Sequence, residues 1–258
     1  MAKVRFSRSK DYREQLRLYN SLTKPLTAKL RRFNSKYGLL AKNQWEGSGR
    51  LSDDYYDEYF QDLYFIHKSH VESIFQSVYD RFRRTREMKA EREVIPLIEE
   101  YVTNQTAQNV ANITESTRRY IQGAVAVALA EGFSQVDTAF AIQQSTGFSD
   151  NRSKLIARTE THQAMNFASF KAANNLLLGD PVKEWGSALD SRTRGWHRDM
   201  AGKTVSINEK FTVFTPVAGG GISERSMDYA GDPNGGASNV INCRCFTLYY
   251  EKGDIVED

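Results

Sequence analysis

From about residue 52 onward, apolar residues recur at mostly three- and four-residue intervals, the spacing of one face of an α-helix. Within residues 52–86 the stripe is largely aromatic, with Tyr56, Phe60 and Tyr64 at its start. Ser52 precedes it as a suitable N-cap, with acidic residues in the first turn and basic residues at the end, as the helix dipole favours. We predict a long helix whose aromatic stripe packs against neighbouring helices rather than stacking on nucleic-acid bases.

Helical spacing continues as far as residue 178. The expected helices start near Val94, at Glu115, after Ser134 and after Ser149, the last one covering residues 150–178. Pro96 falls in a first turn, where its missing N–H is tolerated. Ser134 and Ser149 are typical N-caps, and Gly147 is expected to end the helix between them.

After residue 181 the pattern changes to short β-prone segments. These read VKEWGSAL, KTVSI, FTVFT and CFTLYY, and a loop from Pro216 to Gly236 contains six glycines. Such a composition predicts short strands and a long exposed loop. The fold class expected is therefore α+β: a long-helix N-terminal half followed by a small C-terminal α+β domain with short strands and a Gly-rich loop.

Charge divides the chain unevenly. Residues 1–50 contain 13 Lys and Arg against 3 Asp and Glu, whereas the remainder contains 22 against 29. We expect a basic arm at 1–50, a helical region at 51–148, and a C-terminal domain at 149–258 made of helix 150–178 and a β-rich part, 182–250. Pro25 is expected to interrupt any helix in the arm.

The basic residues of the arm are candidates for contacts with DNA or with an acidic protein surface, and a solvated arm is the alternative. They are Lys3, Arg5, Arg8, Lys10, Arg13, Arg17, Lys24, Lys29, Arg31 and Arg32. No apolar run reaches the roughly 18 residues of a membrane span, and no secretory signal is seen, so no membrane partner is expected.

A series of motifs in the last hundred residues resembles a known family. In order they are Arg158-Thr159-Glu160-Thr161, Lys183-Glu184-Trp185, Asp190-Ser191-Arg192-Thr193-Arg194 with His197, Gly202, Phe211, Gly231-Asp232-Pro233 and Asn242-Cys243-Arg244-Cys245. This part of the chain is similar to the Mu F-like head morphogenesis domain of tailed double-stranded DNA phages. Residues 1–110 match no pattern of that family.

The resemblance implies a minor head protein that associates with the portal and other head proteins. It also implies a role in head morphogenesis and in DNA packaging or ejection, in a virion head assembled in the host cytoplasm. One alternative is a DNA-binding internal head protein delivered with the genome. A second alternative is a metal-dependent enzyme of nuclease or transferase type, which His197, Asp190, Arg192 and Asn242 could assemble. No nucleophile–base pair stands out, and the sequence ends soon after the last motif, so we expect no catalysis.

Two cysteines two positions apart would present both thiols on one face of a strand. Together with His197, Cys243 and Cys245 supply three potential zinc ligands, with Asp190 or His162 as a fourth. The alternatives are a reduced pair packed in the core, which needs no cofactor, and oxidation between copies.

The remaining motif residues are expected to have structural roles: Arg158, Glu160, Trp185, Asp190, Arg192, His197, Asp232, Asn242 and Arg244. Asp190 and Arg192 could pair with each other or brace the loop that carries His197. His197 could donate to Asp190 or to a backbone carbonyl. Arg158 and Glu160 face different directions on a helix, and each is expected to reach a different part of the β-rich region.

Overall fold

The computed structural model describes residues 10–85, 95–177 and 181–250 of the 258-residue chain. These residues form two compact units, each assembled from separate stretches of sequence. The first unit contains the described residues of Met1–Leu22, Glu72–Leu97 and Arg158–Asp258, and the second consists of Thr23–Val71 and Ile98–Ala157. The division expected from the sequence, into a basic arm at 1–50, a helical region at 51–148 and a C-terminal domain at 149–258, remains a prediction.

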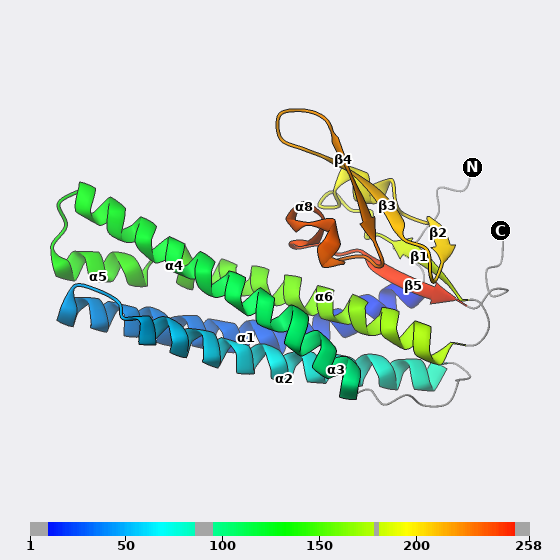
Figure 1. Ribbon diagram of the computed structural model, residues 1–258, viewed down its shortest axis with the longest axis horizontal. Helices are drawn as coiled ribbons and strands as arrows, with labels where there is room; N and C mark the ends of the chain where they lie inside the picture. Colours follow the sequence, from blue (N-terminus) through cyan, green and yellow to red (C-terminus); the bar gives the residue numbers. More distant parts are fainter. Residues whose placement is uncertain (1–9, 86–94, 178–180, 251–258) are drawn as a thin grey trace. The chain divides into compact units, whose positions relative to one another are not determined.

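Long helices come first in the chain and short strands last, which confirms the α+β class (Figure 1). The helical elements are α1 (Lys10–Ser48), α2 (Asp53–Thr85), α3 (Ile95–Tyr101), the π-helical η2 (Val102–Thr106), α4 (Ala107–Ala130), α5 (Gln135–Gln143), the 3₁₀-helical η3 (Thr146–Phe148), α6 (Asp150–Leu176), α7 (Gly195–Arg198), the 3₁₀-helical η4 (Pro233–Gly235) and α8 (Ala237–Val240). The strands are β1 (Val182–Gly186), β2 (Thr204–Ser206), β3 (Phe211–Pro216), β4 (Ile222–Met227) and β5 (Phe246–Tyr250).

Helix α1 contains Pro25 and continues through it, so the expectation of a break at this residue was wrong. A proline inside a helix removes one backbone donor and costs about 3 kcal/mol. Leu26 and Leu30, one and five residues after Pro25, have exposed fractions of 0% and 1%. Burying two leucine side chains stabilises by roughly 3–6 kcal/mol, which is enough to offset that cost.

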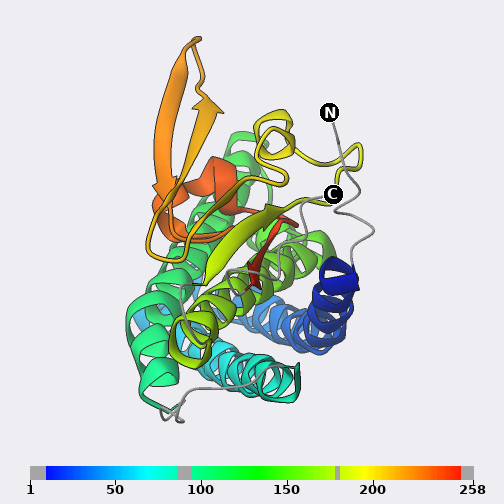
Figure 2. The same cartoon turned by 90° about the vertical axis from the view of Figure 1, so that its right-hand side faces the viewer.

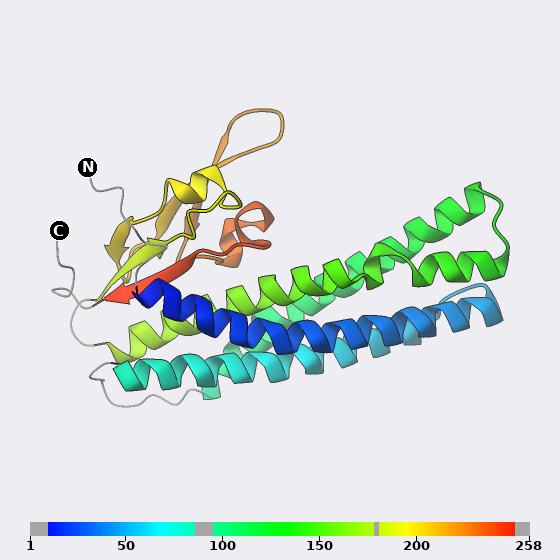
Figure 3. The same ribbon diagram turned by 180° about the vertical axis from the view of Figure 1, so that it is seen from behind.

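The core of the second unit is rich in aromatic side chains from α1 and α2, which lie side by side in Figures 1 and 3. The ring centroid of Tyr59 lies 4.7 Å from that of Phe33 and 5.1 Å from that of Tyr37. The hydroxyl of Tyr59 shares a hydrogen bond of 3.1 Å with Thr117 Oγ1 on α4. The aromatic stripe therefore serves packing, as expected.

Serine side chains begin three of the helices at the predicted positions. Ser52, Ser134 and Ser149 each accept a hydrogen bond from the backbone N–H three residues further on, at 3.1–3.3 Å. Each bond satisfies one of the amides that a helix start leaves without a partner. None of the helices in the described ranges combines the length and the apolar character needed to cross a bilayer.

The strands form two small antiparallel sheets in the first unit. One has the order β2-β1-β5, and the other is the hairpin of β3 and β4 that Figure 2 shows in orange. The exposed loop expected from Pro216 to Gly236 was wrong in part, because β4 lies within it and pairs with β3. The polar sequence ISERSM has no apolar alternation of its own, so its strand depends on pairing with β3.

Candidate functional site

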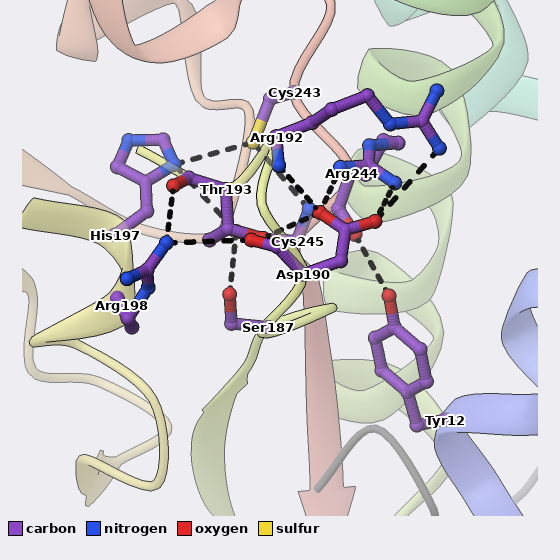
Figure 4. Close-up of polar contacts among 10 residues, drawn as sticks. All are labelled: Tyr12, Ser187, Asp190, Arg192, Thr193, His197, Arg198, Cys243, Arg244 and Cys245. Atoms are coloured by element: carbon purple, nitrogen blue, oxygen red, sulfur yellow. Dashed lines mark hydrogen bonds and ion pairs between the residues drawn. The ribbon is translucent and has the colours of Figure 1, made fainter. Parts of the chain in front are cut away.

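Strand pairing brings the two halves of the C-terminal motif together. In the register of β1 and β5, Gly186 lies opposite Phe246. The residues that follow β1 therefore meet the residues that precede β5. Figure 4 shows the result: side chains from the 187–198 segment and from Cys243, Arg244 and Cys245 converge in one polar cluster.

At the centre of this cluster are one histidine and both cysteines. The Nδ1 atom of His197 lies 3.5 Å from the Sγ atoms of Cys243 and Cys245. All three side chains are buried, at 1–2% exposure, and their donor atoms all lie within 4.8 Å of one another. The structure thus brings together the three residues singled out as potential metal ligands. The cysteines precede β5 instead of lying on it, so the expected strand position was wrong, although both thiols do face His197.

The buried amide of Asn239 holds the other side of His197. Its Oδ1 atom lies 3.0 Å from His197 Nε2 and accepts a hydrogen bond of 2.8 Å from Trp196 Nε1. Its Nδ2 atom donates to Thr215 Oγ1 and to the Gly235 carbonyl, both at 2.8 Å. Pairing of His197 with Asp190 or with a backbone carbonyl was therefore the wrong expectation. Sequence reasoning missed Asn239, because a single asparagine in a Gly-rich segment gives no sign of its partners.

Asp190 pairs mainly with Arg244, from the last motif. Two nitrogens of the Arg244 guanidinium donate to the two carboxylate oxygens at 2.5 and 2.6 Å. Arg192 contributes its backbone N–H at 3.0 Å, and its own guanidinium stays 3.8 Å away. The hydrogen bonds from Arg244 hold the pKa of Asp190 well below its usual range. The expected ion pair with Arg192 is therefore present, but Asp190 has a closer partner 54 residues further along the chain.

The two thiols differ in their affinity for protons. A hydrogen bond between them lowers the pKa of Cys243 and raises that of Cys245. The backbone N–H of Cys245 also points to Cys243 Sγ, at 3.4 Å.

Residues of helix α6 form hydrogen bonds with the backbone at and just after the two cysteines. His162 bonds through Nε2 to the carbonyl of Cys245, while its Nδ1 atom is buried without a hydrogen-bond partner. Asn166 accepts a hydrogen bond of 3.0 Å from the backbone N–H of Thr247. Neither His162 nor Asp190, the two residues considered as a fourth ligand, belongs to the set of donors within 4.8 Å.

The remaining motif residues occupy varied positions. Trp185 is fully buried in the core of the first unit, and Asp232 caps η4 by accepting from Asn234 N at 2.9 Å. Asn242 adopts a positive φ of 55°, and its N–H donates to Thr159 Oγ1 at 3.1 Å. Arg158 is exposed and Glu160 half-buried on α6, and their role as a brace for the β-rich region remains a prediction.

The basic residues assigned to the arm fall into two groups. Lys3, Arg5 and Arg8 lie outside the described residues. The others are exposed on α1: Lys10, Arg13, Arg17, Lys24, Lys29, Arg31 and Arg32. They are thus available for contacts with a partner.

A small cavity adjoins the His–Cys cluster. Its volume of about 10 Å³ is roughly the room of one water molecule. Besides the three donors it is lined by Thr193, Asn242 and the arginines Arg192, Arg194 and Arg244. The cluster can hold a cation and one water molecule, but the cavity has no space for an organic substrate.

Comparison with known proteins agrees with the placement of these motifs. The family model of phage Mu protein F like proteins matches residues 119–248, which is just over half of the chain. The chain belongs to this Mu F-like family. The match includes α6, all five strands up to Leu248 and the whole His–Cys cluster, so the resemblance seen in the motifs is confirmed.

Two curated relatives extend the comparison. The chain is 32% identical over 151 residues to minor head protein GP7 of Bacillus phage SPP1, covering 57% of this chain and 44% of that protein. It is 30% identical over 166 residues to the NAD(+)--arginine ADP-ribosyltransferase EFV of Enterococcus faecalis, covering 60% of this chain and 32% of the transferase. The chain thus spans less than half of either relative. No solved structure matches it. Its Mu F-like membership and the SPP1 relative make it a bacteriophage head protein.

Proposed function

We propose that this protein is a minor structural component of the head that associates with the portal and acts in head morphogenesis and DNA packaging or ejection. The observation that carries the proposal is the Mu F-like match over residues 119–248, together with the similarity to a minor head protein. The virion head, assembled in the host cytoplasm, is the corresponding location.

Exposed apolar side chains in the second unit fit a protein that works in an assembly. Val127, Leu129, Phe133, Val136 and Phe140 are 47–69% exposed and lie within 14 residues on α4, α5 and the turn between them. Apolar side chains gathered in one exposed segment favour contact with another protein. We assign this segment to contact with the portal protein of the same phage.

The contact can be tested with the purified chain and purified portal rings. Sedimentation should show the chain moving with the rings. Replacing Leu129, Val136 and Phe140 by glutamate should weaken this binding at least tenfold. A matched control replaces exposed apolar residues elsewhere, Phe65, Phe214 and Ile222, by glutamate and should leave binding unchanged. If the unaltered chain never sediments with the rings, the portal assignment is wrong.

A structural role accounts for the motif residues better than an enzymatic one. His197 is buried and contacts Asn239 and the two cysteines, and Asp190 accepts hydrogen bonds from Arg244. Both side chains are thus engaged in contacts within the protein. The similarity to a transferase covers 32% of that protein, so the activity in its name does not transfer to this chain. These hydrogen bonds give little support to a nuclease or transferase site built on His197 and Asp190.

DNA contact through α1 is a second candidate function. Lys10, Arg13, Arg17, Lys24 and Arg31 follow one another at intervals of three, four, seven and seven residues on a continuous helix, and all are exposed. This spacing places them along one side of the helix. A line of positive charge suits the phosphates of packaged DNA, as in an internal head protein delivered with the genome.

Salt dependence tests this candidate. The slope of log K for duplex DNA against log salt changes by about 0.9 for each phosphate contact. If each of the five aligned residues contacts one phosphate, changing all five to glutamine should flatten the slope by about 4.5. Five exposed basic residues elsewhere serve as the charge-matched control: Arg83, Arg84, Arg119, Lys203 and Arg225. If both quintuple variants change the slope equally, the effect is one of net charge and the α1 assignment fails.

A further inference from the structure

The spacing of the three donor atoms in the His–Cys cluster matches that of a metal site. A tetrahedral zinc ion with bonds of about 2.3 Å to sulfur and 2.0–2.1 Å to nitrogen places a ligating nitrogen about 3.5–3.6 Å from each ligating sulfur. The Nδ1 atom of His197 lies 3.5 Å from the Sγ of Cys243 and 3.5 Å from the Sγ of Cys245. The two nitrogen–sulfur separations thus already match those of ligands around one ion, and the two sulfurs lie within 4.8 Å of each other.

The proton on His197 can be located from its neighbours. The indole Nε1–H of Trp196 is only a donor, so the Asn239 atom it contacts at 2.8 Å must be the amide oxygen. That oxygen only accepts, and it lies 3.0 Å from His197 Nε2, so Nε2 carries a proton. In a neutral ring, Nδ1 is then unprotonated, and its lone pair faces the two sulfurs. A metal-bound imidazole usually donates its other N–H to an oxygen acceptor, and the Asn239 amide oxygen takes that position here.

The surroundings of the cluster favour a bound cation over an empty core. The three donor side chains are almost fully buried, and a backbone N–H at 3.4 Å stabilises charge on Cys243 Sγ. Two thiolates balance the charge of one divalent ion. The adjoining cavity of about 10 Å³ has room for the single water molecule that completes four-fold coordination.

We propose that His197 Nδ1, Cys243 Sγ and Cys245 Sγ bind one zinc ion, with a water molecule in the adjoining cavity as the fourth ligand. The ion links the segment before β5 to α7, although His197 and Cys243 are 46 residues apart in the sequence. On binding, the two thiol protons leave to solvent and no bond is oxidised or reduced. Thiolate and imidazole donors in this number suit zinc better than the harder ions magnesium and calcium.

The first experiment measures metal in the full chain. Protein produced in zinc-supplemented medium and purified under reducing conditions without chelator should contain about one zinc ion per chain by mass spectrometry. Titration with a mercurial should release that zinc as two thiols are consumed, and X-ray absorption should show two sulfur neighbours per zinc. Less than about 0.2 zinc per chain, both as purified and after reconstitution with zinc chloride, would overturn the proposal in favour of a packed reduced pair.

Variants then locate the ion. The double change of Cys243 and Cys245 to serine should abolish binding, and retention of one zinc per chain would place the ion elsewhere and refute the site. Asn239→Leu leaves all three donors in place and should weaken zinc binding about 10–100-fold, as loss of a supporting hydrogen bond does. The matched control is Asn34→Leu, which removes an equally buried asparagine of the second unit and should leave zinc affinity unchanged. Equal losses in both variants would also refute the site.

Discussion

Gly231, in the Gly-Asp-Pro motif, has a backbone conformation that disfavours any other residue, and no space is left beside it for a side chain. Its φ is +86°, in the left-handed region that favours glycine. A Cβ atom added there would lie 2.6 Å from Cε1 and 2.7 Å from Nδ1 of His162. The His162 ring is fully buried and bonded to the Cys245 carbonyl, so it cannot turn aside freely. Gly231→Ala should therefore destabilise the first unit.

The expected magnitude has three parts. The positive φ costs an alanine about 1–2 kcal/mol, and overlap with a packed ring costs about 1–3 kcal/mol. Reduced freedom of the unfolded chain returns about 0.4–1 kcal/mol. The matched control is Gly236→Ala, because Gly236 has a φ of +74° and nothing within 4 Å of its added Cβ. Both variants place an alanine at a positive φ, but only Gly231→Ala adds the overlap with a packed ring, so it should be the less stable variant by up to about 1–3 kcal/mol.

Urea unfolding followed by tryptophan fluorescence measures this difference. A Trp45→Phe background leaves Trp185 and Trp196, which both report on the first unit. If the two alanine variants agree within about 0.5 kcal/mol, the steric argument is wrong. A further check combines Gly231→Ala with His162→Ala, where the steric part should disappear.

Three other changes test separate parts of the structure. Burial raises the pKa of Glu184 from its ordinary 4.5 to about 7. The contribution of Glu184 to the free energy of unfolding is therefore largest below about pH 4.5, where Glu184 is protonated, and it falls by about 3 kcal/mol as the pH rises through 7. Glu184→Gln should remove this decline, as measured by urea unfolding across that pH range. An unchanged pH profile would contradict the assignment. Asp190→Asn weakens the pair with Arg244. Because the Asp190 side chain is 39% exposed, solvent screens the pair, and we expect a loss of only about 1 kcal/mol in unfolding stability. A loss above about 3 kcal/mol in the same assay would contradict this view. Pro25→Ala restores a backbone donor inside α1 at an exposed position and should raise unfolding stability by about 1–3 kcal/mol, whereas a destabilised variant would show that the proline is needed there.

Local signals in the sequence predicted much of the secondary structure. The serine caps act within three residues, and the β-prone segments carry their own alternation, so both could be recognised without knowledge of the fold. Local signals gave wrong predictions where contacts with residues distant in the sequence determine the secondary structure. Pro25 argues against a helix, but the burial of Leu26 and Leu30 outweighs it. The sequence of β4 has little strand character, and its pairing with β3 supplies what is missing.

The C-terminal motifs by themselves determined the family and named three donors that could share an ion. The choice of partners was decided by the tertiary structure. The register of β1 and β5 brings Cys243 and Cys245 to His197. It also brings Arg244 closer to Asp190 than the sequence neighbour Arg192 is. Asn239, which sets the proton position on His197, is 42 residues from it in sequence and no motif marks it. Hydrogen bonds and metal ligation depend on separations of a few ångströms, and only the folded chain determines which distant residues reach them.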